Sequence, residues 1–442
     1  MKRKVLLVQL PTSHLGAGEK VYPLGLSRLS TTIPQTVDKR VLDMNIVPDP
    51  WPELKEALAG FQPDIIAFSF RNLDPLAGQQ ASYLSSLKTG ALLVRRLLPT
   101  ARILGGGPAF SMFAERLMVE VPQLDIGLKG EGELVFSRLL EQDLSLGHLP
   151  GIVYRNNEKV ITNPPGPKID MDDLPALDLG SFDPGDYIRG NKYVAAVGIE
   201  GKRGCDLWCG YCLYPFLGGT AMRLRSPAKI VDEMEYLNSE YQINLFHFTD
   251  PVVNRPVSHF EALSRELLQR KLDVSWTGFF REDHVTRQNL ALAEEAGLCG
   301  VYFSGDALTV HGLKLLNKRM SREDILDASR VTSELGLLTM CHFLVDLPGE
   351  TESDIRESQD MLDQLLDIHA SAGNLGAVIF NRIRLYPGTP LTKKLIAHGE
   401  LDAETDLLYP VFYSPQKSSH VLHDFDARCH AAGVFSRLGV SS

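Results

Sequence analysis

The stretch Cys205-Asp206-Leu207-Trp208-Cys209-Gly210-Tyr211-Cys212 decides the fold of this 442-residue chain. It holds three of the chain's six cysteines, and no cysteine precedes it. With so few cysteines, the spacing C-x3-C-x2-C is expected by chance only about 0.001 times in such a chain. Thiolates are the usual ligands of iron–sulfur clusters, and three on one loop hold a cubane while leaving its fourth iron open. The sequence therefore predicts a [4Fe–4S] cluster on Cys205, Cys209 and Cys212.

Two other interpretations of the cysteine cluster are weaker. Three buried thiols without a metal would not require this spacing. A structural zinc ion usually takes a fourth Cys or His at a regular spacing. The nearest later histidines, His247 and His259, form no such pair. The grouping of the cysteines also argues against a secreted disulfide framework.

Residues 191–395 alternate apolar runs with helix-length segments around and after this cluster. Six strands are expected, at 193–199, 244–249, 274–280, 300–304, 338–345 and 376–385. Helix starts are indicated by Ser226 before Pro227, and by Ser321 and Thr351 with an Asp three residues on. Six strand–helix units predict a partial (β/α)6 barrel of the TIM type. The cysteine cluster follows the first strand, so it lies at a carboxyl end, where barrel chemistry is built.

Residues 1–140 show a similar alternation with shorter units. Strands are expected at 4–10, 40–44, 64–69, 101–105 and 124–128, and the clearest helices at 82–98 and 131–140. Most of these strands are continuous apolar runs, which is typical of strands covered on both faces. The pattern predicts an N-terminal doubly wound, Rossmann-like parallel sheet, so the chain is α/β throughout. Such a sheet is compatible with a nucleotide, a flavin or no ligand at the carboxyl ends of its strands.

The remaining segments are less regular. The connection between the two patterns is rich in proline and is predicted to be a linker with a small hairpin at 151–155 and 159–162. The end of the chain carries one expected helix, from Asp424 on. The predicted limits are 1–140 for the first domain, 141–190 for the linker, 191–395 for the barrel and 396–442 for a C-terminal extension.

The composition is that of a mildly acidic globular protein. Lys and Arg number 45 against 55 Asp and Glu, and the net charge of −10 disfavours unspecific binding to nucleic acids or anionic membranes. The apolar run after Lys2, Arg3 and Lys4 is too short for a secretory signal. No window reaches the ~20 apolar residues that span a bilayer. We therefore expect a cytoplasmic protein with no membrane span and no nucleic-acid partner.

The cysteine motif, with the aromatic Tyr211 before its last Cys, resembles that of the radical S-adenosylmethionine (SAM) superfamily. The resemblance implies that the three cysteines bind a [4Fe–4S] cluster whose open iron chelates SAM. It also implies an external electron donor, such as flavodoxin or ferredoxin, and cleavage of SAM to a 5′-deoxyadenosyl radical.

Further segments resemble parts of the superfamily that contact SAM. Phe303-Ser304-Gly305-Asp306-Ala307 stands where the family often shows Gly-x-Glu-Ser, so Asp306, a shorter acid, would meet the ribose. Leu315-Leu316-Asn317-Lys318 resembles a segment whose basic residue pairs with the methionine carboxylate. Thr249 and Asp250 end the second strand, near the expected site of the SAM amine. The implied SAM contacts are Tyr211, Thr249, Asp250, Asp306 and Lys318.

Two loops resemble those that follow strands five and six of such barrels. They read Leu347-Pro348-Gly349-Glu350-Thr351 and Tyr386-Pro387-Gly388-Thr389-Pro390. Asp346 replaces the Gly often found before the first of them. Each loop is explained equally well as a tight turn with a helix cap.

A doubly wound sheet joined to a radical SAM barrel resembles the cobalamin-binding (B12) subgroup of the superfamily. The resemblance rests on Tyr22-Pro23-Leu24-Gly25-Leu26, Ser69-Phe70, Gly105-Gly106-Gly107-Pro108 and Lys129-Gly130-Glu131-Gly132-Glu133. Small residues at strand ends let a large corrin and its nucleotide tail approach the backbone. The implied cobalamin contacts are Ser69, Arg71, Asn72, Gly105, Gly106, Gly107, Gly130, Glu131 and Gly132.

One departure from that subgroup concerns the cobalt ligand. Many cobalamin proteins offer a His from Asp-x-His-x-x-Gly, but the loop here reads Pro11-Thr12-Ser13-His14-Leu15-Gly16-Ala17-Gly18. We therefore expect His14 to be a loop residue only, and Arg71 or Asn72 to lie under the corrin. Methylthiotransferases share the barrel but bind a second cluster through cysteines in their first domain, where this chain has none.

The resemblance favours a cobalamin-dependent methyltransferase that acts on an unactivated carbon of a small-molecule or lipid-like substrate, through the 5′-deoxyadenosyl radical. One alternative is a B12-binding radical SAM enzyme that catalyses a cyclisation or rearrangement without methylation. Another is a sensor or maturation scaffold that binds cobalamin and a cluster without turnover. The absence of a recognisable peptide-binding domain favours a small substrate.

Overall fold

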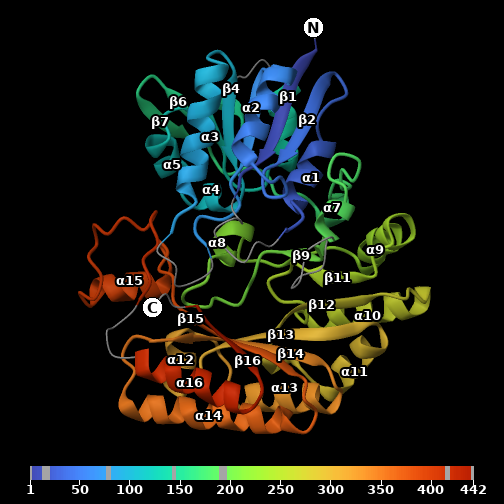
Figure 1. Cartoon of the computed structure of the whole chain (residues 1–442), viewed down its shortest axis with the longest axis vertical. Helices are drawn as coiled ribbons and strands as arrows, with labels where there is room; N and C mark the ends of the chain where they lie inside the picture. Colours follow the sequence, from blue (N-terminus) through green and yellow to red (C-terminus); the bar gives the residue numbers. More distant parts are fainter. Residues whose placement is uncertain are drawn as a thin grey trace. The chain divides into compact units, whose positions relative to one another are not determined.

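A computed structural model of the chain describes residues 2–11, 20–75, 81–141, 146–188, 197–413 and 419–439. It divides into two compact units (Figure 1). The first comprises Met1–Pro75 with Ala81–Val197, and the second comprises Leu76–Gln80 with Gly198–Ser442. The described residues of the predicted linker, 141 and 146–188, fall in the first unit.

The first unit is built on a seven-stranded sheet of order β2-β1-β3-β4-β5-β6-β7. The first five strands pair in parallel, whereas β5–β6 and β6–β7 are antiparallel. The four central residues of β1, Val5 to Val8, are fully buried, as strands covered on both faces require. The strands are β1 (Arg3–Gln9), β2 (Val37–Asp43), β3 (Ile65–Ser69), β4 (Arg102–Gly106), β5 (Ile126–Leu128), β6 (Ile152–Asn156) and β7 (Lys159–Thr162).

Helical crossovers connect the parallel strands, which confirms the predicted doubly wound sheet. They are α1 (Leu24–Thr31), α2 (Pro50–Phe61), α3 (Leu84–Leu97), α4 (Pro108–Met112) and α5 (Ala114–Glu120). A further helix, α6 (Glu133–Glu141), leads from β5 to the antiparallel β6. Later in this unit come η1 (Leu146–His148), η2 (Met171–Asp173) and α7 (Gly185–Ile188).

The segment predicted to be a linker packs on this sheet instead. The hairpin β6–β7 continues the sheet, because β6 pairs antiparallel with β5. This pairing provides hydrogen-bond partners for backbone groups of β5 that would otherwise lie unpaired at the edge of the sheet. Beyond it the chain runs along α1, where Arg28 donates a 2.6 Å hydrogen bond to the carbonyl of Pro175 and Lys39 pairs with Asp178 at 2.7 Å. The helices beyond the hairpin, η2 and α7, are short, and the sequence pattern did not reveal these contacts.

The second unit contains another seven-stranded sheet, of order β16-β15-β14-β13-β12-β11-β8, in which all pairs are parallel. Six strands match the predicted ones, although residues 193–196 of the first lie outside the described residues. The seventh, β16, lies in the predicted C-terminal extension. The strands are β8 (Gly198–Ile199), β11 (Leu245–Phe248), β12 (Ser275–Phe280), β13 (Leu298–Asp306), β14 (Leu338–Val345), β15 (Leu375–Arg382) and β16 (Phe435–Gly439).

The helices of this unit alternate with its strands, and Figure 1 shows α13, α14 and α16 lying along one face of β13–β16. Two short strands, β9 (Lys202–Arg203) and β10 (Arg223–Leu224), form a separate antiparallel pair. Directly after β9 comes the segment from Gly204 to Cys212, which we call the cysteine loop. The helices are α8 (Tyr214–Gly218), α9 (Pro227–Tyr241), α10 (Val257–Arg270), η3 (Glu282–His284), α11 (Arg287–Glu295), α12 (Val310–Leu315), α13 (Arg322–Glu334), α14 (Glu352–Ala370), α15 (Pro390–Ala397) and α16 (Ser419–Ala431).

The two faces of this second sheet differ in burial. On one face Trp276, Phe303 and Phe380 are almost completely buried. On the other, alternate residues such as Phe279 and Tyr302 are only half-buried. The alternation follows from the two-residue period of a strand. The half-buried residues lie on one face of a sheet whose described strands do not close into a full barrel.

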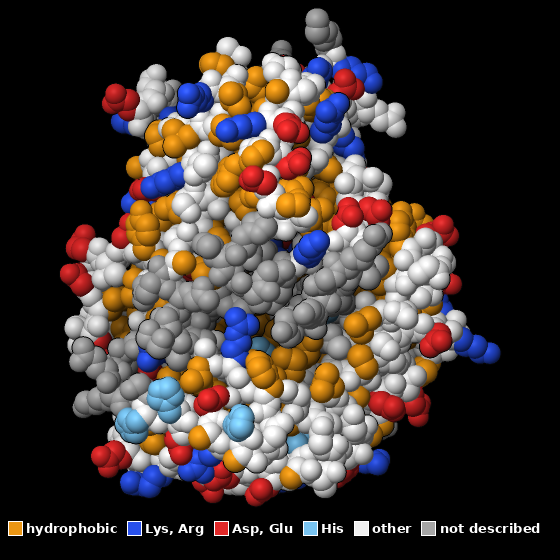
Figure 2. All heavy atoms as spheres, in the orientation of Figure 1, with side chains coloured by type: hydrophobic (Ala, Val, Ile, Leu, Met, Phe, Trp, Pro, Cys, Tyr) orange, Lys and Arg blue, Asp and Glu red, His pale blue; other side chains and the backbone are white. Residues whose placement is uncertain are grey.

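Two general properties of the described residues bear on partners. None of their helices has both the length and the apolar character to cross a bilayer. On the face drawn in Figure 2, acidic and basic side chains lie interspersed and form no broad basic area.

Candidate active site

The cysteine loop begins at a glycine that no other residue could replace without strain. Gly204 has φ +83°, and a Cβ on it would lie 2.2 Å from the carbonyl oxygen of Ala221. The next residue, Cys205, donates its backbone N–H to the carbonyl of Gly219 at 3.0 Å. The chain therefore enters the loop pressed against the segment that ends α8.

Backbone hydrogen bonds then fix the middle of the loop. The N–H of Gly210 donates to the carbonyl of Leu316 at 2.8 Å, and the carbonyl of Gly210 accepts from Leu391 at 2.9 Å. The side-chain amide of Asn317 donates to the carbonyl of Trp208 at 2.7 Å. The loop is thus attached to the segments after α12 and at the start of α15, far away in sequence.

The three thiols lie close enough to influence one another's ionisation. Burial raises the pKa of all three thiols, that of Cys212 to about 12. Cys209 raises the pKa of Cys205 further, and Cys209 and Cys205 raise that of Cys212. The cations of Lys318 and Arg281 oppose this effect at Cys209. Because iron binds the thiolate form, these cations favour the ionisation that a cluster requires.

Three thiolates on one short loop are the donor set typical of an iron–sulfur cluster. Within the described ranges, no three side chains of His, Cys, Asp or Glu converge as ligands of one metal ion. A cubane presents a different iron to each cysteine, so its ligands surround a volume instead of meeting at a point. Cys205, Cys209 and Cys212 would be the three ligands.

Asp306 joins the cysteine loop to the end of β13. Its Oδ2 accepts a hydrogen bond from the hydroxyl of Tyr211 and lies 2.6 Å from Nζ of Lys318. Nζ of Lys318 also donates to the carbonyl of Ser304 at 2.6 Å. Three of the residues predicted to contact SAM are therefore brought together. Burial alone would lower the pKa of Lys318, but the carboxylate of Asp306 raises it above its ordinary value.

The backbone of Asp306 is strained. Its φ is +61°, in the left-handed region, and the pairing of β13 with β14 shifts register between Phe303 and Asp306. Asp346, which replaces a family Gly, has φ +59°, a conformation that Gly adopts at less cost. Strained backbone of this kind persists where surrounding contacts determine it, which is common at functional sites.

The other two predicted SAM contacts have different surroundings. Asp250 is buried and accepts hydrogen bonds from the backbone N–H groups of Gly201 and Lys202, at 2.7 and 3.0 Å. Burial raises its pKa to about 6. Thr249 is exposed, and its hydroxyl donates to the carbonyl of Ile199 at 3.2 Å. Asp250 thus supports the backbone that leads into the cysteine loop.

Several residues around the loop were not predicted from the sequence. Arg255 forms a two-pronged ion pair with Asp206, at 2.7 and 2.8 Å, and approaches Nε2 of His284 at 2.9 Å. Lys202 is buried and donates to the carbonyls of Val253 and Arg255 at 2.8 and 2.7 Å. No local motif indicates these residues, because their partners lie far away in the sequence.

In the first unit, the predicted cobalamin contacts lie at the carboxyl ends of neighbouring strands. Ser69 pairs with Gly106, and the N–H of Phe70 donates to the carbonyl of Gly106 at 2.8 Å. Gly107 has φ +101°, and a Cβ on it would lie 2.8 Å from the carbonyl oxygen of Phe70. Gly105 is different, because its missing side chain makes room for the ring of Phe110, which would lie 2.7 Å from a Cβ at that position. The absence of a side chain at Gly105 thus allows Phe110 to pack against the strand.

The other predicted cobalamin contacts differ in exposure and in hydrogen bonding. Arg71 is exposed and Asn72 half-buried. The N–H of Gly130 donates to the hydroxyl of Ser111 at 3.0 Å, and Glu131 accepts from the N–H of Ile169 at 3.0 Å. Gly132 begins α6 by accepting from the N–H groups of the first turn. His14 lies outside the described residues.

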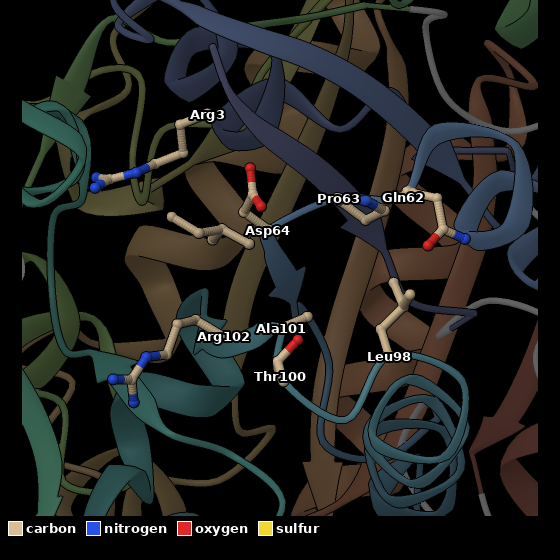
Figure 3. A pocket seen from close by; sticks show the side chains of 9 residues that line it. Arg3, Gln62, Pro63, Asp64, Leu98, Thr100, Ala101 and Arg102 are labelled. Atoms are coloured by element: carbon tan, nitrogen blue, oxygen red, sulfur yellow. The ribbon is translucent and has the colours of Figure 1, made fainter. Parts of the chain in front are cut away.

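A cavity of about 350 Å³ opens at the opposite end of this sheet, beside Arg3, Asp64 and Arg102 (Figure 3). It lies at the amino ends of β1, β3 and β4. Ligands of doubly wound sheets bind at the carboxyl ends. We therefore assign it no part in the chemistry.

A family model described as the radical SAM superfamily matches residues 199–362. The matched segment starts at the end of β8, contains the three cysteines and extends into α14. Residues 199–362 therefore form a radical SAM domain. The resemblance drawn from the cysteine motif is confirmed for this domain, which implies a [4Fe–4S] cluster and SAM as cofactors.

Two relatives extend the comparison beyond the radical SAM segment. An uncharacterized methyltransferase of Pyrococcus horikoshii, PH0819, is 26% identical over 407 residues, covering 90% of this chain and 84% of that protein. The anaerobic magnesium-protoporphyrin IX monomethyl ester cyclase of Cereibacter sphaeroides is 27% identical over 322 residues, covering 70% of this chain. The match spans 50% of the cyclase.

The fold of the radical SAM methyltransferase TsrM from Kitasatospora setae, solved with tryptophan and a SAM analogue, is similar along nearly the whole chain. The TM-score is 0.80 at 22% identity, and the match covers 97% of this chain and 89% of TsrM. Another TsrM structure holds cobalamin and a [4Fe–4S] cluster. At this identity the likeness shows the fold, so the predicted combination of a Rossmann-like sheet and a partial barrel is confirmed.

Proposed function

We propose that this radical SAM protein is a cobalamin-dependent methyltransferase that acts on a small molecule. The observation that carries the proposal is the likeness of 97% of the chain to the methyltransferase TsrM, of which a cobalamin-bound structure exists. A relative that matches 90% of this chain is also named a methyltransferase. A radical SAM domain alone would not indicate methyl transfer, so the proposal depends on the two units together.

The cysteine loop would hold the cluster on Cys205, Cys209 and Cys212. With SAM bound, the reduced cluster supplies a 5′-deoxyadenosyl radical, for which an external electron donor is needed. The backbone hydrogen bonds of Gly210 fix the loop before a cluster binds. The positive charge of Arg281 and Lys318 lies where thiolates form.

Asp306 and Lys318 retain donor and acceptor capacity for SAM although they bind each other. Both hydrogen bonds that Asp306 accepts within the described residues end on Oδ2, which leaves Oδ1 for a ribose hydroxyl. Nζ of Lys318 has three N–H donors, and two are directed to Ser304 and Asp306. The third would meet the methionine carboxylate. Asp250, by contrast, would position the loop instead of contacting SAM.

In the first unit, Ser69, Gly106 and Gly107 would accept the nucleotide tail of cobalamin at the strand ends. Cobalamin supplies a carrier for the methyl group when bound. Gly107 fits this role because its position has no space for a side chain and brings its backbone close to a neighbour. Arg71 or Asn72 would lie under the corrin, in place of a histidine.

The test is anaerobic reconstitution of the full chain with iron, sulfide and hydroxocobalamin, followed by reduction in the presence of SAM. We expect a [4Fe–4S] signal in electron paramagnetic resonance, a bound-cobalamin absorption spectrum, and formation of 5′-deoxyadenosine. Alanine at Cys205, Cys209 or Cys212 should abolish the iron signal. Alanine at Cys299, Cys341 or Cys429 should leave it unchanged. Iron that is retained after all three loop cysteines are replaced would overturn the assignment.

A second candidate, a cyclisation or rearrangement without methylation, is favoured by the 27% identity to the magnesium-protoporphyrin cyclase. The two reactions differ in product mass. Methyl transfer adds one carbon to the substrate, whereas cyclisation adds none. Mass spectrometry with SAM labelled in its methyl group therefore separates them.

A further inference from the structure

The inner face of the barrel sheet carries a group of four ring side chains, His247, Phe279, Tyr302 and His342, which we call the ring surface. They come from four adjacent strands, β11 to β14. The ring of Phe279 lies 5.9 Å from that of His247, 5.5 Å from that of Tyr302 and 5.8 Å from that of His342, centroid to centroid. The rings of His247 and Tyr302 are 5.1 Å apart.

The ring surface is not sealed like the opposite face of the same sheet. Its members Phe279, Tyr302 and His342 are half-buried, whereas Trp276 and Phe303 on the opposite face are at most 1% exposed. A closed TIM-type barrel fills its interior with its own side chains. Among the described strands the sheet is open, so the rings of Phe279, Tyr302 and His342 remain accessible to a ligand, whereas His247, 8% exposed, lies behind them.

The ring surface has polar atoms but no formal charge at neutral pH. Burial lowers the pKa of His247 to about 4 and also lowers that of His342. Burial raises the pKa of Tyr302. Nδ1 of His247 lies 2.8 Å from the hydroxyl of Thr277, which orients this ring. A charged ligand would lose its hydration here without meeting an opposite charge on these rings.

The ring surface adjoins the residues that hold the cysteine loop. Tyr302 and Asp306 lie on the same strand, β13, and the carboxylate of Asp306 influences the imidazole of His342 on β14. Asp306 in turn binds Tyr211, between Cys209 and Cys212. A ligand on the ring surface would therefore lie on the same side of the barrel as the proposed radical source.

We propose that the ring surface binds an uncharged, flat aromatic ring of the substrate. This inference rests on the proposed function and specifies its substrate class. Aromatic pairs prefer edge-to-face or offset arrangements with centroids 4.5–7 Å apart. The four rings are inclined to one another by 32° to 81° and so offer both edges and faces to a further ring. An aliphatic ligand would gain only the burial of its surface.

The test compares two neutral probes, indole and cyclohexanol, by equilibrium dialysis against the reconstituted full-length protein. We expect indole to bind more tightly, and Phe279→Leu to weaken indole binding about 2- to 10-fold while leaving cyclohexanol unchanged. Tyr302→Phe, which keeps the ring, should bind indole like the wild type. Tyr236→Leu, on α9 and 53% exposed, is the matched control and should have no effect.

Equal binding of the two probes, or unchanged indole binding in Phe279→Leu, would overturn the inference. If Phe279→Leu loses its cluster absorbance, His342→Gln replaces it as the test, with the same expected selective loss of indole binding. Formation of 5′-deoxyadenosine is measured on the same preparations. If it forms but indole does not bind selectively, the ring surface is wrong and the radical chemistry stands. If it does not form although indole binding depends on Phe279, the proposed function fails instead.

Discussion

Nζ of Lys318 lies 2.6 Å from Oδ2 of Asp306, and the two side chains are only 5% and 9% exposed. Both residues were predicted to contact SAM, one at the carboxylate and one at the ribose. The structure makes each the partner of the other. Since Asp306 also accepts from Tyr211, this ion pair holds the cysteine loop against β13.

Replacing Asp306 with Ala should therefore destabilise the protein strongly, because it leaves a buried ammonium without its counter-charge. Removal of one partner of a buried pair typically costs about 3–5 kcal/mol. Lys318→Met alone should cost less, and the double variant Asp306→Ala/Lys318→Met should recover part of the loss. Anaerobic thermal unfolding measures all three. Additive effects of the two single changes would contradict the pairing.

The ion pair of Arg255 with Asp206 should affect the cluster more than the fold. The two side chains are 30% and 40% exposed, so the pair contributes only about 0.5–1 kcal/mol to stability. It does, however, restrain the loop between Cys205 and Cys209. We expect Arg255→Met to release iron to a chelator several-fold faster, and Arg255→Lys to be intermediate because it lacks the two-pronged geometry.

The matched control for this experiment is Arg265→Met, which removes an exposed i,i+4 pair with Glu261 on α10. It should release iron at the wild-type rate. Equal rates for the Arg255 and Arg265 variants would show that the ion pair with Asp206 has no influence on the cluster.

Much of the fold could be predicted because its signals are local. The apolar runs indicated the strands, and Ser321 and Thr351 form the capping boxes with Asp324 and Asp354 that their spacing indicated. The edge strand β16 was missed because its burial pattern is not distinctive, with Phe435 62% exposed. The pairing of the hairpin with β5 was missed because edge pairing is a tertiary choice.

The candidate site divides in the same way. Cys205, Cys209 and Cys212 share one short motif, so a common role as cluster ligands could be predicted from spacing alone. Asp306 and Lys318 were predicted through resemblance, but their pairing depends on how β13 and α12 pack. No motif in the sequence includes Arg255. Its ion pair with Asp206, 49 positions earlier in the chain, is known only from the structure.

Gly107 and Gly130 allow backbone strain to be separated from steric exclusion in the first unit. Both have positive φ, +101° and +94°. A Cβ at Gly107 would lie 2.8 Å from a backbone oxygen, whereas nothing lies within 4 Å of one at Gly130. We expect Gly130→Ala to cost about 1–3 kcal/mol from conformation alone, and Gly107→Ala to cost more. Denaturant unfolding tests the order, and a larger loss in Gly130→Ala would contradict it.

Glu282 should make stability depend on pH. It is buried behind Gly305, where a Cβ would lie 3.1 Å from its Oε1, and neither carboxyl oxygen has a hydrogen-bond partner among the described residues. Burial raises its pKa to about 7, against the opposing effect of the cation of Lys318. The folded state therefore keeps the proton to higher pH than the unfolded state, in which the pKa is near 4.5.

It follows that the wild type binds more protons when folded between pH 4.5 and 7, so its stability falls as the pH rises through this window. Glu282→Gln keeps the shape and removes the ionisation. Its stability relative to the wild type should rise by up to ~1.4 kcal/mol per pH unit and level off above pH 7. Anaerobic thermal unfolding between about pH 5.5 and 8 measures this, with the exposed Glu294→Gln as control. A difference that stays constant across that range would mean that the Glu282 carboxyl titrates normally and is not confined as described.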